Sequence, residues 1–271
     1  MSKTNKKGTA LVTGASSGIG AVYADRLARR GYDLILVARN QAKLEQLATK
    51  LSAETGAQVR TLAADLTVDS DVAKVEKVLR EDHSINVLVN NAGTATLGPL
   101  VGADIARLGG EIQLNIVAPT RLAHAVAPGL ASRGHGAIIN IASVMSQMVQ
   151  PGNSVYGGTK AYLLHFSQVL EQELAASGVR VQAVLPGATR TDIWNGSGVE
   201  LHQLPEEIVM EADEMVDAAL AGFDQGESVT IPALPQAADW QRLLEAREAL
   251  KPNLSRKHAA ARYKSDEAVA A

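Results

Sequence analysis

The sequence predicts an α/β fold, in which one doubly wound sheet of seven parallel strands carries helices on both faces. Short apolar runs recur with helical patterns between them, and this alternation implies parallel pairing through right-handed crossovers. Runs such as ALVT, LILVA and AIINIA are continuously apolar rather than alternating, which is typical of strands covered on both faces. The predicted strands comprise residues 9–13, 33–38, 58–63, 86–90, 137–142, 179–185 and 228–231.

Helical spacing of apolar residues fills the segments between these strands. Gly31 and Gly178 follow two of the helical patterns, at the position where helix ends favour a left-handed residue. The predicted helices comprise residues 18–30, 41–55, 69–82, 106–132, 154–177, 211–224 and 236–250. Beyond them the chain is polar and alanine-rich. We therefore expect a single domain over residues 1–250 and a surface tail over residues 251–271.

Composition narrows the class of protein. The 271 residues are 46% hydrophobic and 20% charged, which suffices for one large core. A formal net charge of −3 argues against a nucleic-acid partner. The absence of cysteine excludes disulfides and thiolate nucleophiles and fits a reducing compartment, and the six histidines show no paired ligand spacing, so no metal site is predicted. No run approaches about 18 apolar residues, so we expect a cytoplasmic protein with no membrane partner.

The segment TGASSGIG, residues 13–20, is a glycine-rich turn between the first predicted strand and the first helix. Gly14 permits a tight exit from the strand, Gly18 lets the backbone approach a pyrophosphate, and Gly20 lets the helix lie close to the sheet. A phosphate there would meet free N–H groups and the positive end of the helix. Without a ligand, the same residues would simply form a strand-to-helix loop. The dinucleotide interpretation adds three further contacts: Ser16, Ser17 and Ile19.

The end of the second strand predicts which dinucleotide binds. An acidic residue at this position accepts hydrogen bonds from the adenosine ribose, but residues 37–40 contain no acid. Arg39 offers a planar cation that matches a 2′-phosphate, with Ser16, Ser17 and Asn40 as neutral donors. We therefore expect NADP(H). The alternative is that Arg39 is solvated or stacks on adenine.

Tyr156 and Lys160 are spaced i, i+4, so in a helix both side chains leave the same face. A phenol with an ordinary pKa near 10 is a reluctant acid or base at neutral pH. One cation about 4 to 5 Å away, at an effective dielectric near 20, would stabilise the phenolate by about 3 to 4 kcal/mol. Gly157 and Gly158 weaken a helix and favour a close neighbour or ligand, unless the helix begins at Thr159.

Two more polar residues lie where they could serve this chemistry. Ser143 ends the strand pattern INIAS and could bond the same carbonyl oxygen, or could act only as a turn or cap residue. Asn115 lies inside the apolar pattern IQLNIVA, where a buried amide must find partners, so either a functional role or a local kink is open.

Together these motifs resemble the classical short-chain dehydrogenase/reductase family, a Rossmann-like fold, over about residues 8–232. TGASSGIG resembles its cofactor turn, Asp65-Leu66 its adenine-contacting pair, and NNAG, residues 90–93, its central-strand motif. PGATRT, residues 186–191, resembles its Pro-Gly-x-x-x-Thr segment. The resemblance adds the cofactor contacts Asp65, Leu66, Asn91, Ala92, Gly93, Tyr156, Lys160, Pro186, Gly187, Thr189 and Thr191, and gives the catalytic tetrad as Asn115, Ser143, Tyr156 and Lys160.

The resemblance also assigns roles. Tyr156 is the proton donor, Ser143 orients the carbonyl, Lys160 lowers the tyrosine pKa and holds the nicotinamide ribose, and Asn115 supports a water relay. Ser17 departs from the pattern, because this place is often basic in NADP-preferring members, so Arg39 carries the cofactor choice almost alone. A homotetramer or homodimer is implied through the helices after the fourth and fifth strands.

The sequence therefore predicts an NADP(H)-dependent enzyme that reversibly reduces a ketone or aldehyde to an alcohol. A substrate loop over about residues 191–210 would close the pocket with apolar side chains. A non-catalytic NADP(H)-binding redox sensor and an NAD-preferring alcohol dehydrogenase are the alternatives. A sugar-nucleotide epimerase is disfavoured by the glycine spacing. The apolar loop residues are Ile193, Trp194, Val199 and Leu201.

Overall fold

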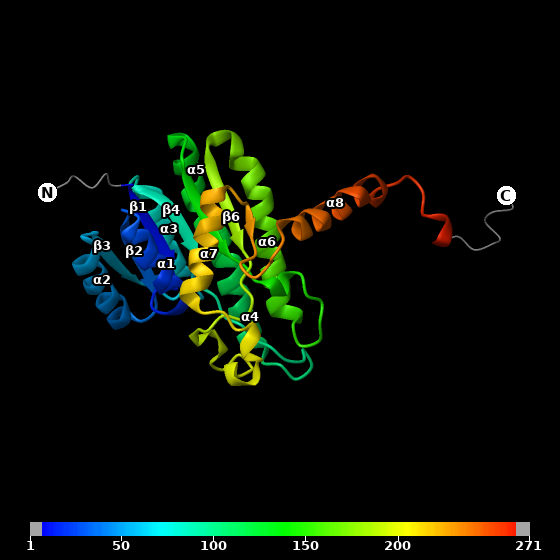
Figure 1. Ribbon diagram of the computed structural model, residues 1–271, viewed down its shortest axis with the longest axis horizontal. Coiled ribbons are helices and arrows are strands. Elements are labelled where there is room, and N and C mark those ends of the chain that lie inside the picture. The colour runs from blue at the N-terminus through cyan, green and yellow to red at the C-terminus, as the bar shows by residue number, and fades with distance from the viewer. Residues whose placement is uncertain (1–6, 264–271) are drawn as a thin grey trace. The chain divides into compact units, whose positions relative to one another are not determined.

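The computed structural model describes residues 7–263, and its central feature is a parallel seven-stranded sheet (Figure 1). The strand order is β3-β2-β1-β4-β5-β6-β7, and every neighbouring pair is parallel. Each predicted strand is confirmed to within one residue at either end. Their bounds are β1 Thr9–Thr13, β2 Asp33–Ala38, β3 Val59–Ala63, β4 Ile85–Asn90, β5 Gly136–Ile141, β6 Val179–Val184 and β7 Val229–Thr230.

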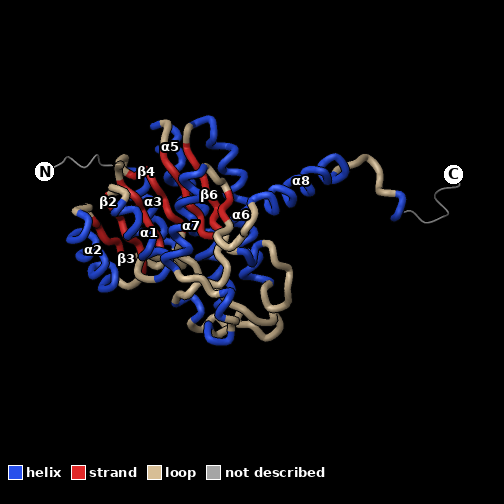
Figure 2. The backbone as a smooth tube through the Cα atoms, in the orientation of Figure 1, coloured by secondary structure: helices blue, strands red, loops and turns tan. Residues whose placement is uncertain are grey.

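Helices cover both faces of the sheet, as Figure 2 shows. One hydrophobic cluster joins the sheet to α1, α2 and α7, and a second joins its other face to α3, α5 and α6. No helix within residues 7–263 is long and apolar enough to cross a membrane. The bounds are α1 Gly18–Arg29, α2 Gln41–Thr55, α3 Asp69–Glu81, α4 Ile105–Ile112, α5 Ala118–Arg133, α6 Ser154–Leu174 and α7 Ala212–Gln225.

The strand order places the candidate ligand site. The chain winds outward from β1 through β2 to β3, then returns to β4 on the other side of β1. Ligands of open parallel sheets bind beyond the carboxyl ends of the strands at such a reversal. The glycine turn follows β1 and the NNAG motif begins at the end of β4, so both predicted motifs meet at this reversal.

One predicted helix is interrupted. Residues 106–132 were expected to form a single helix, but the structure has α4, a π-helical turn over Gln113–Val117, and α5. A π-turn holds one more residue than an α-turn, so it re-aims the side chains on either side of it. Asn115 lies in this turn and is buried. The kink that the sequence left open for Asn115 is therefore present.

The chain divides into two compact units, with the boundary between Pro232 and Ala233. In the second unit, α8 spans Ala237–Leu254, and none of its residues, all of which the structure describes, is buried. The boundary expected at residue 250 lies inside this helix, which continues past Pro252. Of the predicted tail, residues 264–271 lie outside the described residues.

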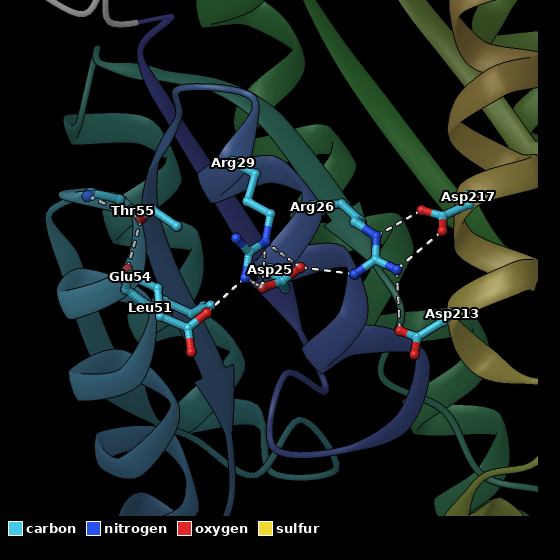
Figure 3. A network of polar contacts seen from close by, with 9 residues as sticks. Asp25, Arg26, Arg29, Leu51, Glu54, Thr55, Asp213 and Asp217 are labelled. Carbon is cyan, nitrogen blue, oxygen red and sulfur yellow. Dashed lines mark hydrogen bonds and ion pairs between the residues drawn. The ribbon is translucent and has the colours of Figure 1, made fainter.

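Charged side chains fix α1 against its two neighbouring helices (Figure 3). Arg26 donates to both carboxylate oxygens of Asp217 on α7, at 2.7 and 3.0 Å. Arg29 bridges Asp25 and Glu54, the latter on α2 at 2.6 Å. The helix whose first turn faces the ligand edge is thus held on both sides by surface ion pairs.

Candidate active site

The glycine turn leaves β1 with the backbone geometry expected from the sequence. Gly14 and Gly18 have φ angles of +65° and +52°, in the left-handed region that favours glycine. A Cβ on Gly20 would stand 2.3 Å from the carbonyl oxygen of Gly14 and 2.4 Å from the amide nitrogen of Asn91. The three glycines are therefore required by close packing at this turn.

The first turn of α1 is suited to an anion. Ser17 occupies the N-cap without a side-chain capping bond, and no acidic residue lies in the first turn. The first N–H groups of a helix have no partner inside the helix and carry partial positive charge. Ser16 and Ser17 are half-buried, and Ile19 packs against the core beneath. This cradle fits the pyrophosphate of a dinucleotide.

The NNAG segment forms hydrogen bonds that join the end of β4 to the end of β1. The Asn91 side chain donates to the carbonyl oxygens of Thr13 at 2.9 Å and Gly14 at 3.2 Å. The Thr13 hydroxyl in turn accepts from the backbone N–H groups of Asn91 and Ala92, both at 3.0 Å. These bonds join the ends of β1 and β4. Asn91 therefore helps to hold the predicted cofactor turn in place through its hydrogen bonds to the backbone of Thr13 and Gly14.

The groups predicted to bind the adenosine end lie beyond β2 and β3. Arg39 is exposed just after β2 and makes no ion pair with any residue that the structure describes. Asn40, in contrast, caps α2 by accepting from the backbone N–H of Lys43 at 3.0 Å. Asp65 accepts two hydrogen bonds from Thr67, and Leu66 packs in the core.

Tyr156 and Lys160 are buried together on α6. The Lys160 Nζ lies 5.7 Å from the centre of the Tyr156 ring and donates to the carbonyl oxygen of Ile141, at the end of β5, at 2.9 Å. Because α6 begins at Ser154, a helix start at Thr159 is wrong. A Cβ on Gly157 would stand 2.4 Å from the Asn153 amide, whereas one on Gly158 would meet no described atom within 4 Å.

Burial dominates the electrostatics of this pair. Burial raises the pKa of Tyr156 to about 12; the Ser143 hydroxyl opposes this rise and Glu111 adds to it. Burial lowers the pKa of Lys160 to about 8, and the negative charge of Glu111 opposes that shift. The sequence argument weighed the charge of Lys160 but left out the loss of solvation, which is the largest effect on the pKa of Tyr156.

Ser143 combines the two roles considered for it. Its hydroxyl accepts from the backbone N–H of Met145 at 3.1 Å, which caps a 3₁₀ turn over Val144–Ser146. It also donates to the carbonyl oxygen of Pro186 at 3.5 Å. These backbone bonds fix the hydroxyl close enough to Tyr156 to lower the pKa of the phenol.

Asn115 is tied into the same cluster by its side chain. The amide nitrogen donates to Thr94 O at 2.9 Å and to the Thr159 hydroxyl at 3.1 Å, and the amide oxygen accepts from the Thr94 N–H at 3.0 Å. A Cβ on Gly93 would stand 3.2 Å from the Asn115 oxygen and 3.4 Å from Lys160 Nζ. The π-turn, the NNAG loop and α6 therefore converge, and Gly93 makes room for them.

The segment after β6 closes over the glycine turn. The Thr191 methyl lies 3.0 Å from the position of a Cβ on Gly18. Thr189 is buried, its hydroxyl donates to Gly187 O at 3.2 Å, and its carbonyl oxygen accepts from the Trp194 indole at 2.8 Å. Residues 186–191 thus lie against the predicted cofactor cradle.

Hydrogen bonds hold the predicted substrate loop near its middle, at Gly196 and Ser197. Ser197 is buried, and its carbonyl oxygen accepts from the Leu97 N–H at 2.7 Å. Arg107 on α4 donates to Gly196 O and, at 3.1 Å, to the Thr96 hydroxyl. The predicted apolar residues Ile193, Trp194, Val199 and Leu201 are all partly buried.

Sequence reasoning missed three residues of this cluster. Thr13 and Thr159 carry ordinary hydroxyls whose partners, Asn91 and Asn115, come from distant segments. Glu111 is fully buried beside the site, although a charged residue in an amphipathic helix would be expected to face solvent. The spacing of Glu111 four residues before Asn115 was the one signal available.

The sequence profile of the short chain dehydrogenase family matches residues 8–200, more than half of the chain. The chain belongs to the classical short-chain dehydrogenase/reductase family. An uncharacterised oxidoreductase of Staphylococcus epidermidis is 33% identical to this short-chain dehydrogenase/reductase over 232 residues, which cover 85% of this chain and 96% of the relative.

Solved structures agree with this membership. A short-chain dehydrogenase from Sphingobium yanoikuyae in complex with NADPH is 52% identical, with a TM-score of 0.92, and the match covers 95% of this short-chain dehydrogenase/reductase and 100% of that chain. A bulky-bulky ketone specific alcohol dehydrogenase from Comamonas testosteroni is 47% identical, with a TM-score of 0.88, over 95% and 99% of the two chains. The protein is an oxidoreductase with the fold of its family.

Proposed function

We propose that this short-chain dehydrogenase/reductase transfers hydride between NADP(H) and a carbonyl or alcohol substrate, with Tyr156 as the proton donor of the reduction. The observation that carries the proposal is the burial of Tyr156 and Lys160 beside Ser143, at the sheet edge that also holds the glycine turn. A catalytic acid must lie within reach of the oxygen that it protonates, and a buried cluster excludes competing water.

The proposed preference for NADP(H) rests on Arg39. This guanidinium is exposed, unpaired among the described residues, and follows a strand that ends without an acidic residue. A 2′-phosphate would supply the two negative charges that such a cation binds well. The bound NADPH of the Sphingobium relative supports the same choice.

Each tetrad residue has a task that its geometry supports. The bound dinucleotide would supply or accept the hydride. Tyr156, with a pKa of about 12, carries its proton at neutral pH and can give it to an alkoxide. Lys160, with a pKa of about 8, is largely protonated there and is aimed by its bond to Ile141. Ser143 can donate to the same substrate oxygen, and Asn115 holds the loop beside Lys160.

We further infer that the substrate is an apolar ketone. Leu100, Val101, Met148 and Val149 are exposed on two loops that are joined by the hydrogen bond from Gly98 N to Gly152 O. The second loop follows Ser143 directly. Leu97, next to Gly98 on the first loop, donates its backbone N–H to Ser197 O in the substrate loop. The Comamonas relative, described as bulky-bulky ketone specific, supports this substrate class.

The homo-oligomer stays a prediction. Its basis in the structure is the outer surface of α6, where Tyr162 and Val169 are exposed and the Tyr162 ring stacks on Phe166 with centres 5.9 Å apart. Apolar helix faces of this kind are common at contacts between copies of a chain.

The test is turnover of NADPH with a panel of apolar ketones, aldehydes, sugars and acyl-thioesters, followed by loss of NADPH absorbance. Tyr156→Phe should bind NADPH with unchanged affinity but lose about 10²- to 10⁴-fold in turnover, because the acid is removed and the packing is kept. Full activity in that variant would exclude the phenol as the acid. Tight NADPH binding without turnover of any substrate would favour a redox sensor.

A further inference from the structure

Glu111 is a buried carboxylate that the proposed reaction does not use. It lies on α4, one residue before the helix ends, and its relative exposure is 0%. Neither carboxylate oxygen has a hydrogen-bond partner in the described part of the chain. Burial raises the pKa of Glu111, whereas Thr96, Lys160 and Arg107 oppose that rise and favour the charged carboxylate.

The groups that face Glu111 come from three segments. Lys160 and Tyr156 face it from α6, Arg107 precedes it by one turn on α4, and Thr96 approaches from the loop after β4. Thr96 stabilises the carboxylate but lies outside hydrogen-bond geometry. Arg107 is already bonded to Thr96 and Gly196. Arg107 is exposed, whereas Lys160 is buried and its Nζ lies beside the same Gly93 position as Asn115, which is one turn beyond Glu111. Lys160 is therefore the buried cation that balances Glu111.

Lys160 has bonding capacity to spare. An ammonium group has three N–H donors, and the bond to Ile141 O uses one of them. Glu111 opposes the effect of burial on Lys160 and raises the pKa of Tyr156. Both effects have the same sign, because a negative charge holds protons on any neighbouring group.

We propose that Glu111 is a positioning residue that acts through Lys160: its buried charge keeps Lys160 as an ammonium and Tyr156 as a phenol, which are the protonation states from which a carbonyl is reduced. The reductive part rests on the proposed function, whereas the charge balance does not. Glu111 needs no contact with substrate or dinucleotide for this role. It acts as the fixed counter-charge of a cation that would otherwise lose its proton near neutral pH.

The first test uses the full-length, ligand-free protein. Lysine residues labelled with ¹³C at Cε are titrated by NMR, and the Lys160 signal is assigned by its loss in Lys160→Met. In Glu111→Gln the Lys160 midpoint should fall by about one pH unit or more. Glu214→Gln removes the same charge from an exposed site on α7 and should leave the midpoint unchanged. Glu111→Asp keeps the charge and should restore most of the shift.

The second test is the pH profile of kcat/KM for NADPH-dependent ketone reduction. The alkaline limb, where Lys160 loses its proton, should move to lower pH in Glu111→Gln by the same amount as the NMR midpoint. A purely structural role would reduce activity at every pH and leave the limb in place. Glu111→Leu fills a similar volume without charge and serves if the Gln variant does not fold, because uncharged isosteres often preserve buried sites.

The outcomes separate the two proposals. An unchanged Lys160 midpoint in folded Glu111→Gln or Glu111→Leu would overturn the role of Glu111, whatever the enzyme reduces. A lowered midpoint without turnover of any carbonyl substrate would support the charge balance and overturn the reductase assignment.

Discussion

Two groups of charges in this molecule have opposite surroundings. Around α1, Arg26, Arg29 and their acidic partners range from half-buried to exposed, and each cation meets at least two carboxylates (Figure 3). Lys160 on α6 and Glu111 on α4 are fully or almost fully buried, and Lys160 donates its hydrogen bond to the backbone carbonyl of Ile141. The charges with the most partners are those that water already stabilises.

The difference separates structural charges from functional ones. Exposed ion pairs contribute little to stability, because solvent screens them and both side chains lose freedom. Buried charges with few partners lower stability, and proteins keep them where a proton or ligand must be handled. Arg39 is a third case, exposed but unpaired, as expected for a charge whose partner is a ligand. Three substitutions test this division.

Lys160→Met should have the largest effect. Turnover should fall by about 10²-fold or more, because the cation beside the phenol is lost. Relative to the parent, the free energy of unfolding of the variant should be about 2 to 3 kcal/mol higher at pH 7 than at pH 10, since the pKa of Lys160 is about 8 in the folded protein and its usual value is 10.5.

The size of that stability difference depends on pH. The unfolded chain binds the Lys160 proton more tightly, so the penalty is present below pH 8 and disappears as the pH rises towards 10.5. Urea unfolding at pH 7 and pH 10 measures both values. A variant that is less stable than the parent at pH 7 would show that Lys160 contributes to the fold.

Arg39→Asp should have an intermediate effect that is confined to the dinucleotide. The ratio of kcat/KM for NADPH to that for NADH should fall about 10- to 100-fold, because a charge-assisted bond is replaced by repulsion. Lys50→Asp makes the same charge change at an exposed position of α2 and should leave the ratio unchanged. An equal fall in both variants would assign the effect to net charge.

Asp217→Asn should have the smallest effect. Arg26 keeps its contacts with Asp25 and Asp213, so the loss of unfolding free energy should not exceed about 1 kcal/mol, with turnover unchanged. The loss should shrink further in high salt. Chemical unfolding at two salt concentrations tests this. A loss of several kcal/mol would contradict the division between the two groups of charges.

The sequence predicted the sheet well because buried parallel strands are marked by local composition. The same local reasoning failed at residues 113–117, since one extra residue in a turn hardly changes the apolar periodicity of a 27-residue pattern. Likewise, the last helix was expected to end at residue 250, yet α8 continues past Pro252 to Leu254. Such features depend on what packs around the backbone.

The positions of the candidate site residues could be predicted from motifs. Their protonation states could not, because these depend on burial. Tyr156, Lys160, Ser143 and Asn115 come together from three segments, as the resemblance implied. The protonation of Tyr156 was not predictable, because spacing reveals a nearby cation but gives no measure of lost solvent. Glu111 was missed for the same reason.

The contact between Thr191 and Gly18 bears on the order in which two reactants meet the enzyme. The methyl of Thr191 leaves no room for a side chain on the glycine that opens α1, and the same stretch of chain continues into the predicted substrate loop. A dinucleotide resting on that helix would underlie the start of the loop. If the dinucleotide binds there as proposed, we expect it to enter before the second reactant and to leave after it.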